Sequence, residues 1–307
     1  MLVVAGNVTL DDTVLPDGRT VMGVVGGDVL YSGLAAALWT RPVGLLSRVG
    51  DDFSPHDLDR VRAAGLDTAG IHLHPGPTIR YWIVYEWDGR RHFILRTPEE
   101  RLHALSPEPD ELPPAYARMI HAVHVAAMPF DQVERLVRAA AALPSHPSIT
   151  LDTHEDFVDG YQGRFAELLP LLAAFLPSRE EVALWFGYDD PEQAIARLLD
   201  LGPGAVVIKM GAAGALAQGR GEDRPRLVPP VPTDVRDVTG AGDAFCGGFA
   251  ARLADGAGVL DAAMAGAVAA SFAVERHGSL GLIGVDARVR DERLARLRGM
   301  MEGSATV

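Results

Sequence analysis

Lysine and cysteine are almost absent from this chain of 307 residues. Lys209 is the single lysine among 28 basic residues, and Cys246 is the single cysteine. Because Lys209 is followed by Met210 and Gly211, the chain has no G-x-x-x-x-G-K-[ST] phosphate loop, and any Schiff-base chemistry would depend on this one residue. One cysteine also excludes an intramolecular disulfide and a cysteine-based zinc cluster, as is usual in a reducing compartment.

Positive charge and long apolar runs are scarce as well. The chain has 28 basic and 41 acidic residues, a formal net charge of −13 at pH 7, and such a field repels nucleic-acid backbones and anionic membranes. The longest uncharged helical stretch, residues 262–274, is too short for a bilayer core of about 30 Å. The N-terminal apolar run is typical of a strand rather than of a signal peptide. We therefore expect a soluble, cytoplasmic protein with no nucleic-acid or membrane partner.

Short apolar runs alternate along the chain with longer amphipathic stretches. The apolar runs are typical of strands buried on both faces, at residues 2–5, 43–47, 122–126, 149–151, 173–176 and 206–208. The amphipathic stretches are typical of helices, at residues 32–38, 55–64, 131–142, 164–169, 180–186 and 191–201. This alternation predicts an α/β fold with a mainly parallel central sheet covered by helices.

One region interrupts that alternation. Residues 78–97 are rich in aromatic and β-branched side chains, and Asp88-Gly89 between the two halves indicates a β-hairpin. We expect a small β-sheet subdomain built from residues 12–25 and 72–97, inserted in an α/β core of residues 1–11, 26–71 and 98–307. Its aromatic side chains need burial, so the subdomain either closes over a pocket as a lid or packs against a second copy of the chain.

The segment D-V-T-G-A-G-D-A-F at residues 237–245 carries the strongest chemical signal. Gly240, Ala241 and Gly242 at a helix start would point consecutive backbone N–H groups outward, which favours binding of a phosphoryl group. Asp243, one step into that helix, would be placed to accept a proton from an attacking hydroxyl group. An acidic first turn after a glycine-rich entry is the alternative interpretation.

This segment resembles the C-terminal signature of the ribokinase-like (PfkB) sugar kinase family, and the resemblance extends from Gly6 to about Gly278. Residues 6–11 are similar to the first strand of that family with its substrate-binding aspartate, and Gly26-Gly27 to its N-terminal glycine pair. Residues 207–214 are similar to its nucleotide-binding strand and turn. The resemblance implies a three-layer α/β sandwich with an inserted β-sheet lid, which often forms a dimer.

The resemblance also implies roles for individual residues. Asp243 would be the catalytic base, with Gly240, Ala241 and Gly242 as the anion hole. The residues expected to bind the substrate are Asp11, Gly26, Gly27, Tyr31 and Arg80. Those expected at the nucleotide are Ser178, Lys209, Gly211, Gly214 and His277. The cofactors would be ATP and Mg²⁺.

Two further sites follow from the same comparison. Ser178 and Glu181 occupy the first and last positions of the family's N-x-x-E motif, where Glu181 would hold Mg²⁺ through water; serine replaces the asparagine. S-R-E-E is also a helix capping box, and both readings can hold together. Asp237 and Thr239 resemble a monovalent-cation site, which suggests K⁺ as a further cofactor.

Two positions bear on the substrate. Tyr31 stands where many family members carry asparagine, so the ribose or fructose of the better-known members should not be assumed as the substrate of this chain. The pattern around Tyr31 is similar to that of inositol-kinase-like members. Arg80, on the expected lid, either enters the pocket or is solvated.

We therefore expect an ATP-dependent kinase that phosphorylates a hydroxyl group of a small sugar or polyol, with an inositol-like compound as one candidate. A nucleoside kinase of the same fold is an alternative, because lid aromatics could stack on a base. A non-catalytic sugar-binding or regulatory protein is a second alternative. The lid could also join two copies into a homodimer.

Overall fold

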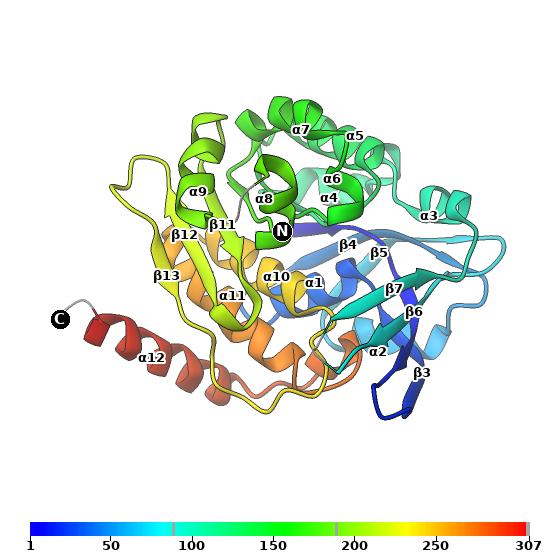
Figure 1. Ribbon diagram of the computed structural model, residues 1–307. Helices are drawn as coiled ribbons and strands as arrows, with labels where there is room; N and C mark the ends of the chain where they lie inside the picture. The colour runs from blue at the N-terminus through cyan, green and yellow to red at the C-terminus, as the bar shows by residue number, and fades with distance from the viewer. Residues whose placement is uncertain (88–89, 188–189, 305–307) are drawn as a thin grey trace.

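A nine-stranded sheet forms the centre of the molecule in a computed structural model that describes residues 1–87, 90–187 and 190–304 (Figure 1). The strand order is β13-β12-β11-β10-β9-β8-β1-β4-β5, and only the pairs β11–β12 and β12–β13 are antiparallel. The strands are β1 (Leu2–Ala5), β4 (Val43–Gly50), β5 (Leu66–His74), β8 (Ala122–Val125), β9 (Ser148–Leu151), β10 (Ala174–Phe175), β11 (Ala205–Lys209), β12 (Ala215–Gly219) and β13 (Arg226–Val228). The mainly parallel α/β sheet expected from the alternating pattern is confirmed.

All six predicted strands are present, whereas β5, β12 and β13 were not predicted. Strand β1 lies between β4 and β8, and its four residues are buried because helices cover both faces of the sheet. Strand β5 alternates buried and exposed residues at its start, and β13 is a three-residue edge strand. Neither of these carries the continuous apolar run that marks a central parallel strand.

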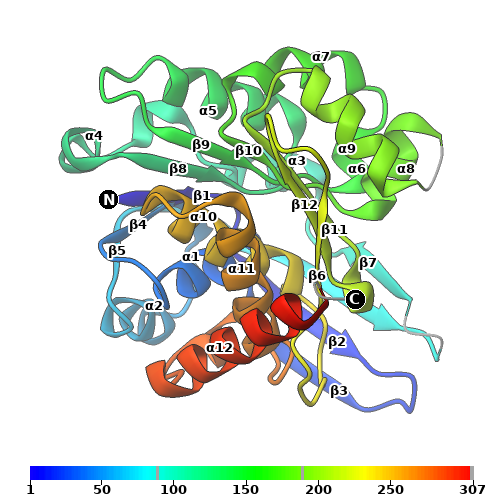
Figure 2. The same ribbon diagram turned by 90° about the vertical axis from the view of Figure 1, so that its left-hand side faces the viewer.

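Helices cover both faces of the sheet, so the fold has three layers (Figure 2). One face packs against α1 (Asp28–Ala36), α2 (Pro55–Ala63), α10 (Ala241–Ala254), α11 (Val259–Ala273) and α12 (Ala287–Ser304). The other packs against α4 (Pro114–Met119), α5 (Phe130–Ala141), α6 (Glu155–Val158), α7 (Gln162–Leu168), α8 (Arg179–Phe186) and α9 (Pro191–Asp200). No helix in the described residues is long and apolar enough to span a membrane.

A second sheet of four strands, in the order β3-β2-β6-β7, lies beside the large one and forms the lid subdomain. Its strands are β2 (Thr9–Val14), β3 (Thr20–Gly26), β6 (Ile79–Tyr85) and β7 (Arg91–Leu95), and α3 (Glu99–Leu105) packs at its base. The sheet begins at residue 9 rather than 12, because Thr9 pairs with Ile79. Residues 72–74 belong instead to β5 of the large sheet. The expected Asp88-Gly89 turn lies outside the described residues, and β6 and β7 on either side of it pair antiparallel.

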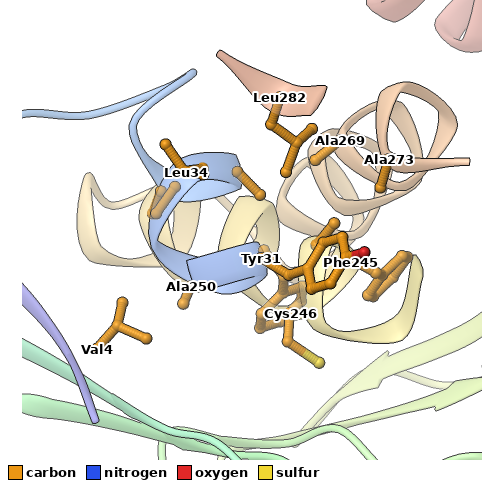
Figure 3. Close-up of a cluster of buried hydrophobic side chains, with 14 of the residues drawn as sticks. Val4, Tyr31, Leu34, Phe245, Cys246, Ala250, Ala269, Ala273 and Leu282 are labelled. Atoms are coloured by element: carbon orange, nitrogen blue, oxygen red, sulfur yellow. The ribbon is translucent and has the colours of Figure 1, made fainter. Parts of the chain in front are cut away.

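Helices α1 and α10 pack closely in the apolar core behind the first sheet (Figure 3). Figure 3 shows Tyr31 of α1 beside Phe245 and Cys246 of α10. A Cβ atom at Gly247 would lie 2.0 Å from the carbonyl oxygen of Ser32, so only glycine allows this approach. The core thereby sets the position of the α10 N-terminus relative to α1.

Candidate active site

The glycine-rich turn at residues 240–242 forms the N-terminus of α10. Gly240 is the N-cap and has a left-handed backbone with φ of 73°; a Cβ atom there would also lie 2.4 Å from the ring of Tyr31. The N–H group of Ala241 donates to the carbonyl of Val238 at 3.3 Å. Within the described residues, the N–H groups of Gly242 and Asp243 have no acceptor, as is usual in a first helical turn. These two donors and the helix dipole can therefore bind an anion.

Asp243 lies beside this anion-binding turn. Its backbone carbonyl accepts a hydrogen bond of 2.9 Å from the Ser32 hydroxyl, which ties the start of α10 to α1. The residue is only half-buried, yet the surrounding protein atoms, and secondly the charge of Asp152, raise the pKa of Asp243 to about 6. A carboxylate with this pKa is ionised at neutral pH and still a better proton acceptor than an ordinary aspartate.

Asp11 lies on lid strand β2, facing the same region. Burial raises the pKa of Asp11 to about 7, and the charges of Asp237 and Asp243 contribute in the same direction. A Cβ atom at Gly26 would lie 2.1 Å from Oδ2 of Asp11, so glycine at this position makes room for the carboxyl group. Gly27 has φ of 97° and begins α1 directly behind it. The structure thus brings Asp11 and the glycine pair together, and their contact with a substrate stays a prediction.

Asp28 is a buried carboxyl group near Asp243 that the sequence analysis missed. Its Oδ1 accepts a hydrogen bond of 2.7 Å from the backbone N–H of Asn7. Burial, and secondly the charge of Asp243, raise the pKa of Asp28 well above its usual range. Its position immediately after the Gly26-Gly27 pair was the available signal, because that pair was expected to bind the substrate.

Lys209 and Asp152 form a buried ion pair beneath the anion-binding turn. The ammonium group of Lys209 lies 2.5 Å from Oδ1 of Asp152, and the Cys246 thiol donates to Oδ2 of the same carboxylate at 3.2 Å. Burial by itself lowers the pKa of Lys209, but Asp152 together with Cys246 and Glu181 outweighs burial, and the net pKa is raised. A Cβ atom at Gly242 would lie 3.5 Å from Nζ of Lys209, so the lysine supports the turn from below. Its predicted contact with a nucleotide stays a prediction.

Gly211 and Gly214, also expected at the nucleotide, flank a short turn between β11 and β12. The turn Gly211–Ala213 is a 3₁₀ helix. Gly214 has φ of 91°, and a Cβ atom there would lie 2.2 Å from the carbonyl oxygen of Val228. Glycine at residue 214 is therefore required by the close passage of the neighbouring segment, whether or not a nucleotide is bound.

Ser178 and Glu181 form the capping box of α8. The N–H of Glu181 donates to the Ser178 hydroxyl at 3.2 Å, and the N–H of Ser178 donates to Oε2 of Glu181 at 2.7 Å. Burial raises the pKa of Glu181 to about 7, while the charge of Lys209 acts in the opposite direction. Within the described residues, no three His, Cys, Asp or Glu side chains are grouped so that they alone could hold a metal ion. A metal at Glu181 would need oxygen ligands from phosphates and water, which suits Mg²⁺.

Asp237 joins the lid to the turn before α10. Its Oδ1 accepts hydrogen bonds from the Tyr85 hydroxyl at 2.6 Å and from the Thr239 N–H at 2.9 Å. Its Oδ2 lies 2.8 Å from Nδ1 of His277, which the sequence analysis placed near the nucleotide. Burial by itself raises the pKa of Asp237, but these hydrogen bonds outweigh it and lower the net pKa. Three donors satisfy the carboxylate without a cation, and the expected monovalent cation at Asp237 and Thr239 stays a prediction.

The two residues expected to select the substrate have other contacts. Tyr31 is 2% exposed and lies in the core with its ring against Gly240, so it shapes the anion-binding turn from behind. Arg80 forms an ion pair of 2.8 Å with Asp52, whose other carboxylate oxygen accepts hydrogen bonds from Thr78. The sequence could not indicate these partners, because each depends on a distant segment of the chain.

An aromatic side chain of the lid contacts His154 of the core, whose charge is close enough to lower the pKa of Asp243. The ring of Phe93 on β7 lies edge-on to Tyr81 at 6.4 Å and to His154 at 6.0 Å between ring centroids. Phe93 remains 42% exposed, so part of its ring is accessible to a ligand.

A three-layer α/β sandwich with a β lid over an aspartate and an anion-binding helix start defines a phosphotransferase of the ribokinase-like class. The model of the pfkB family carbohydrate kinases matches residues 6–282. The chain therefore belongs to the pfkB family, and it is an ATP-dependent sugar or nucleoside kinase.

Individual relatives agree with this assignment. A cytidine kinase of Thermococcus kodakarensis is 29% identical over 259 residues, which cover 83% of this chain and 89% of the relative. A candidate ribokinase II of Escherichia coli, solved with ATP and Mg²⁺, has a TM-score of 0.78 and 22% identity, with coverage of 96% of this chain and 99% of that one. A nucleoside kinase of Burkholderia thailandensis, solved with inosine, has a TM-score of 0.79 and 17% identity, with coverage of 97% of this chain and 99% of that one. At these identities, the two structures establish the fold alone.

Proposed function

We propose that the chain transfers the γ-phosphoryl group of ATP to a hydroxyl group of a small polyhydroxylated substrate, a sugar or polyol. The observation that carries this proposal is the start of α10. There, two backbone N–H groups that have no acceptor in the described part of the chain stand beside a carboxylate whose pKa is about 6. Anion binding and proton acceptance are thus available in adjacent residues, as direct phosphoryl transfer to an alcohol requires.

The substrate would lie between the lid and the core. Asp11 and the backbone of Gly26-Gly27 would bind its hydroxyl groups, and the reacting hydroxyl would point at Asp243. Asp243 takes the proton as the acceptor oxygen forms its bond to phosphorus, and the bond between the γ-phosphorus and the bridging oxygen of ADP breaks. The N–H groups of Gly242 and Asp243 stabilise the charge on the phosphoryl oxygens meanwhile.

Magnesium would enter with ATP. Glu181 would hold it through water, and the bound ion would neutralise charge on the phosphates. ATP itself would lie along the turn of residues 211–214 and the loop at His277. The E. coli structure solved with ATP and Mg²⁺ supports this pairing of cofactors.

A nucleoside substrate is a second candidate, which one specific observation favours. The exposed part of the Phe93 ring, together with Tyr81 and His154, provides an aromatic surface on which a base could stack. The relative named cytidine kinase supports the same class. The inositol-like substrate rests on the sequence resemblance around Tyr31 alone, since Tyr31 itself lies in the core with its ring against Gly240. A homodimer through the lid and a cytoplasmic location likewise stay predictions.

The decisive experiment is ADP release from Mg·ATP across a panel of ketoses, aldoses, inositols, other polyols and nucleosides. We expect one class to give turnover, and Asp243→Asn to lower kcat by about 10³-fold or more, because the base is lost while ATP still binds. Preference for nucleosides would select the second candidate. Binding of ATP without turnover on any acceptor, or near wild-type turnover in Asp243→Asn, would contradict the proposed mechanism.

A further inference from the structure

Asp237, in the loop before α10, is surrounded by hydrogen-bond donors from three segments of the chain. Its side chain is 4% exposed. Oδ1 accepts from the Tyr85 hydroxyl of β6 at 2.6 Å and from the Thr239 N–H at 2.9 Å, and Oδ2 lies 2.8 Å from Nδ1 of His277, in the loop after α11. Because a carboxylate oxygen only accepts, Nδ1 of His277 carries the proton. Figure 1 shows the β6–β7 pair extending towards the segment ahead of α10.

The carbonyl oxygens beside this carboxylate are used in the same way. The carbonyl of Val274 accepts from the backbone N–H groups of residues 236 and 237 at 2.8 and 3.2 Å. The carbonyl of Val238 accepts from the N–H of Ala241 and from Nη1 of Arg91, each at 3.3 Å. A carbonyl oxygen has two lone pairs, so both oxygens are saturated by protein donors.

The residues at this place do not fit the monovalent cation that the family resemblance implied. K⁺ is held by oxygen lone pairs that replace its water shell. At Asp237 three of those positions face the hydrogen atoms of donors, which carry the same sign of partial charge as a cation. The Thr239 hydroxyl, 3.0 Å from that of Tyr85, donates to it, because Tyr85 uses its single proton on Asp237.

We propose that Tyr85 and His277 take the place of the monovalent cation in this chain, so that turnover needs no K⁺. Asp237 lies three residues before Gly240, the N-cap of α10. The two side chains bind its two carboxylate oxygens from different segments and thereby fix the loop that leads into the anion-binding turn. Tyr85 and His277 are thus positioning residues. This inference rests on the proposed function and replaces the expectation of K⁺ as a cofactor.

The first part of the test uses the wild-type enzyme and the acceptor that gives turnover in the panel above. The value of kcat is measured in KCl, NaCl and tetramethylammonium chloride at about 0.1 M each, with ATP as its Tris salt, so that charge screening is equal. We expect the three values to agree within about twofold. Melting temperatures in the same salts need no substrate, and a bound ion would raise them. We expect no rise specific to K⁺.

The second part opens the carboxylate to a cation. We expect Tyr85→Phe and His277→Ala each to lower kcat at saturating ATP about tenfold in tetramethylammonium chloride, as for one lost hydrogen bond to a charged group, and KCl to restore most of the loss. His277→Gln keeps a donor and should respond less to K⁺ than His277→Ala. The matched controls are Tyr161→Phe and His103→Ala. Tyr161 stacks on Phe130 across the large sheet from α10, and His103 is exposed on α3, so both should match wild type.

Three outcomes would overturn the inference. A wild-type kcat about tenfold or more higher in KCl than in tetramethylammonium chloride, or a K⁺-specific rise in the wild-type melting temperature, would show that a cation binds after all. Folded variants that lose kcat without recovery in KCl would show that the two side chains do not stand in for a cation. Variants that behave like the controls would remove them from the positioning of the loop.

Folding and activity are separated in the same experiment. If neither Tyr85→Phe nor His277→Ala folds, the wild-type salt series decides. Absence of wild-type turnover on every acceptor would overturn the proposed function, and the melting temperatures would then decide the cation question. A K⁺-specific rise in Tyr85→Phe and none in the wild type would support the inference, and the reverse would overturn it.

Discussion

Single carboxyl groups in this protein differ in proton affinity because their surroundings differ. Burial raises the pKa of Asp11 to about 7 and that of Asp243 to about 6, whereas hydrogen bonds from Tyr85 and Thr239 lower the pKa of Asp237 in spite of its burial. Asp243 therefore combines ionisation at neutral pH with useful basicity. Asp237 remains an anion that accepts hydrogen bonds from the lid and the turn.

The pH dependence of turnover should report on Asp243. The base works only when ionised. Because its pKa is raised to about 6, activity should be lost at a higher pH than it would be with an ordinary aspartate. We expect kcat/KM to fall about tenfold for each pH unit below 6. A pH profile from 4.5 to 8 measures this, with melting temperatures at each pH as the control for unfolding. A flat profile down to pH 4.5 would exclude Asp243 as the base.

Two helices set the geometry of the site through one close contact. The Ser32 hydroxyl on α1 donates to the carbonyl of Asp243 on α10, and Gly247 lets the two helices approach. Since interiors are densely packed, a change in that contact would move the anion-binding turn and the base together.

Replacing Gly247 by alanine should test the role of this contact. The added Cβ atom would lie 2.0 Å from the Ser32 carbonyl oxygen, so the helices must separate. We expect a loss of about 2 to 3 kcal/mol in the free energy of unfolding, with reduced kcat. Gly299→Ala is the matched control: Gly299 is exposed on α12 with no atom within 4 Å of the added Cβ, and alanine should stabilise that helix by up to about 1 kcal/mol. Equal stabilities of the two variants would contradict this account of the α1–α10 contact.

The whole molecule carries a formal net charge of −13 and buries several carboxyl groups around one site. Asp11, Asp243 and Glu181 have pKa values of about 7, 6 and 7 in the folded chain, above those of an unfolded chain. At a pH between the pKa values of the unfolded chain and those of the folded chain, the folded state binds more protons than the unfolded state. The stability of the fold therefore falls as pH rises through this range.

Mild acidification should therefore stabilise the protein. We expect the free energy of unfolding in urea to be about 1 to 2 kcal/mol greater at pH 6 than at pH 8, at constant ionic strength. Buried His124, with its pKa lowered to about 4, opposes the effect because it stays neutral in the fold while it is protonated in the unfolded chain. Asp243→Asn should reduce the difference between the two pH values. A lower stability at pH 6 than at pH 8 in the wild-type chain would show that the buried carboxyl groups do not dominate.

The sequence by itself determined the alternation of helices with the six apolar strands of the large sheet, the glycine-rich turn with Asp243, and the family. These depend on local patterns: apolar periodicity, helix-start residues and motif spacing. Only the tertiary structure decided which side chains surround Asp243. Tyr85 and Asp237 are 152 positions apart, and Lys209 and Asp152 are 57 apart. Asp152 stands in no motif that marks it, because its partner Lys209 comes from another element. These contacts form because segments that are distant in the sequence pack together, and such packing leaves no local pattern in the chain.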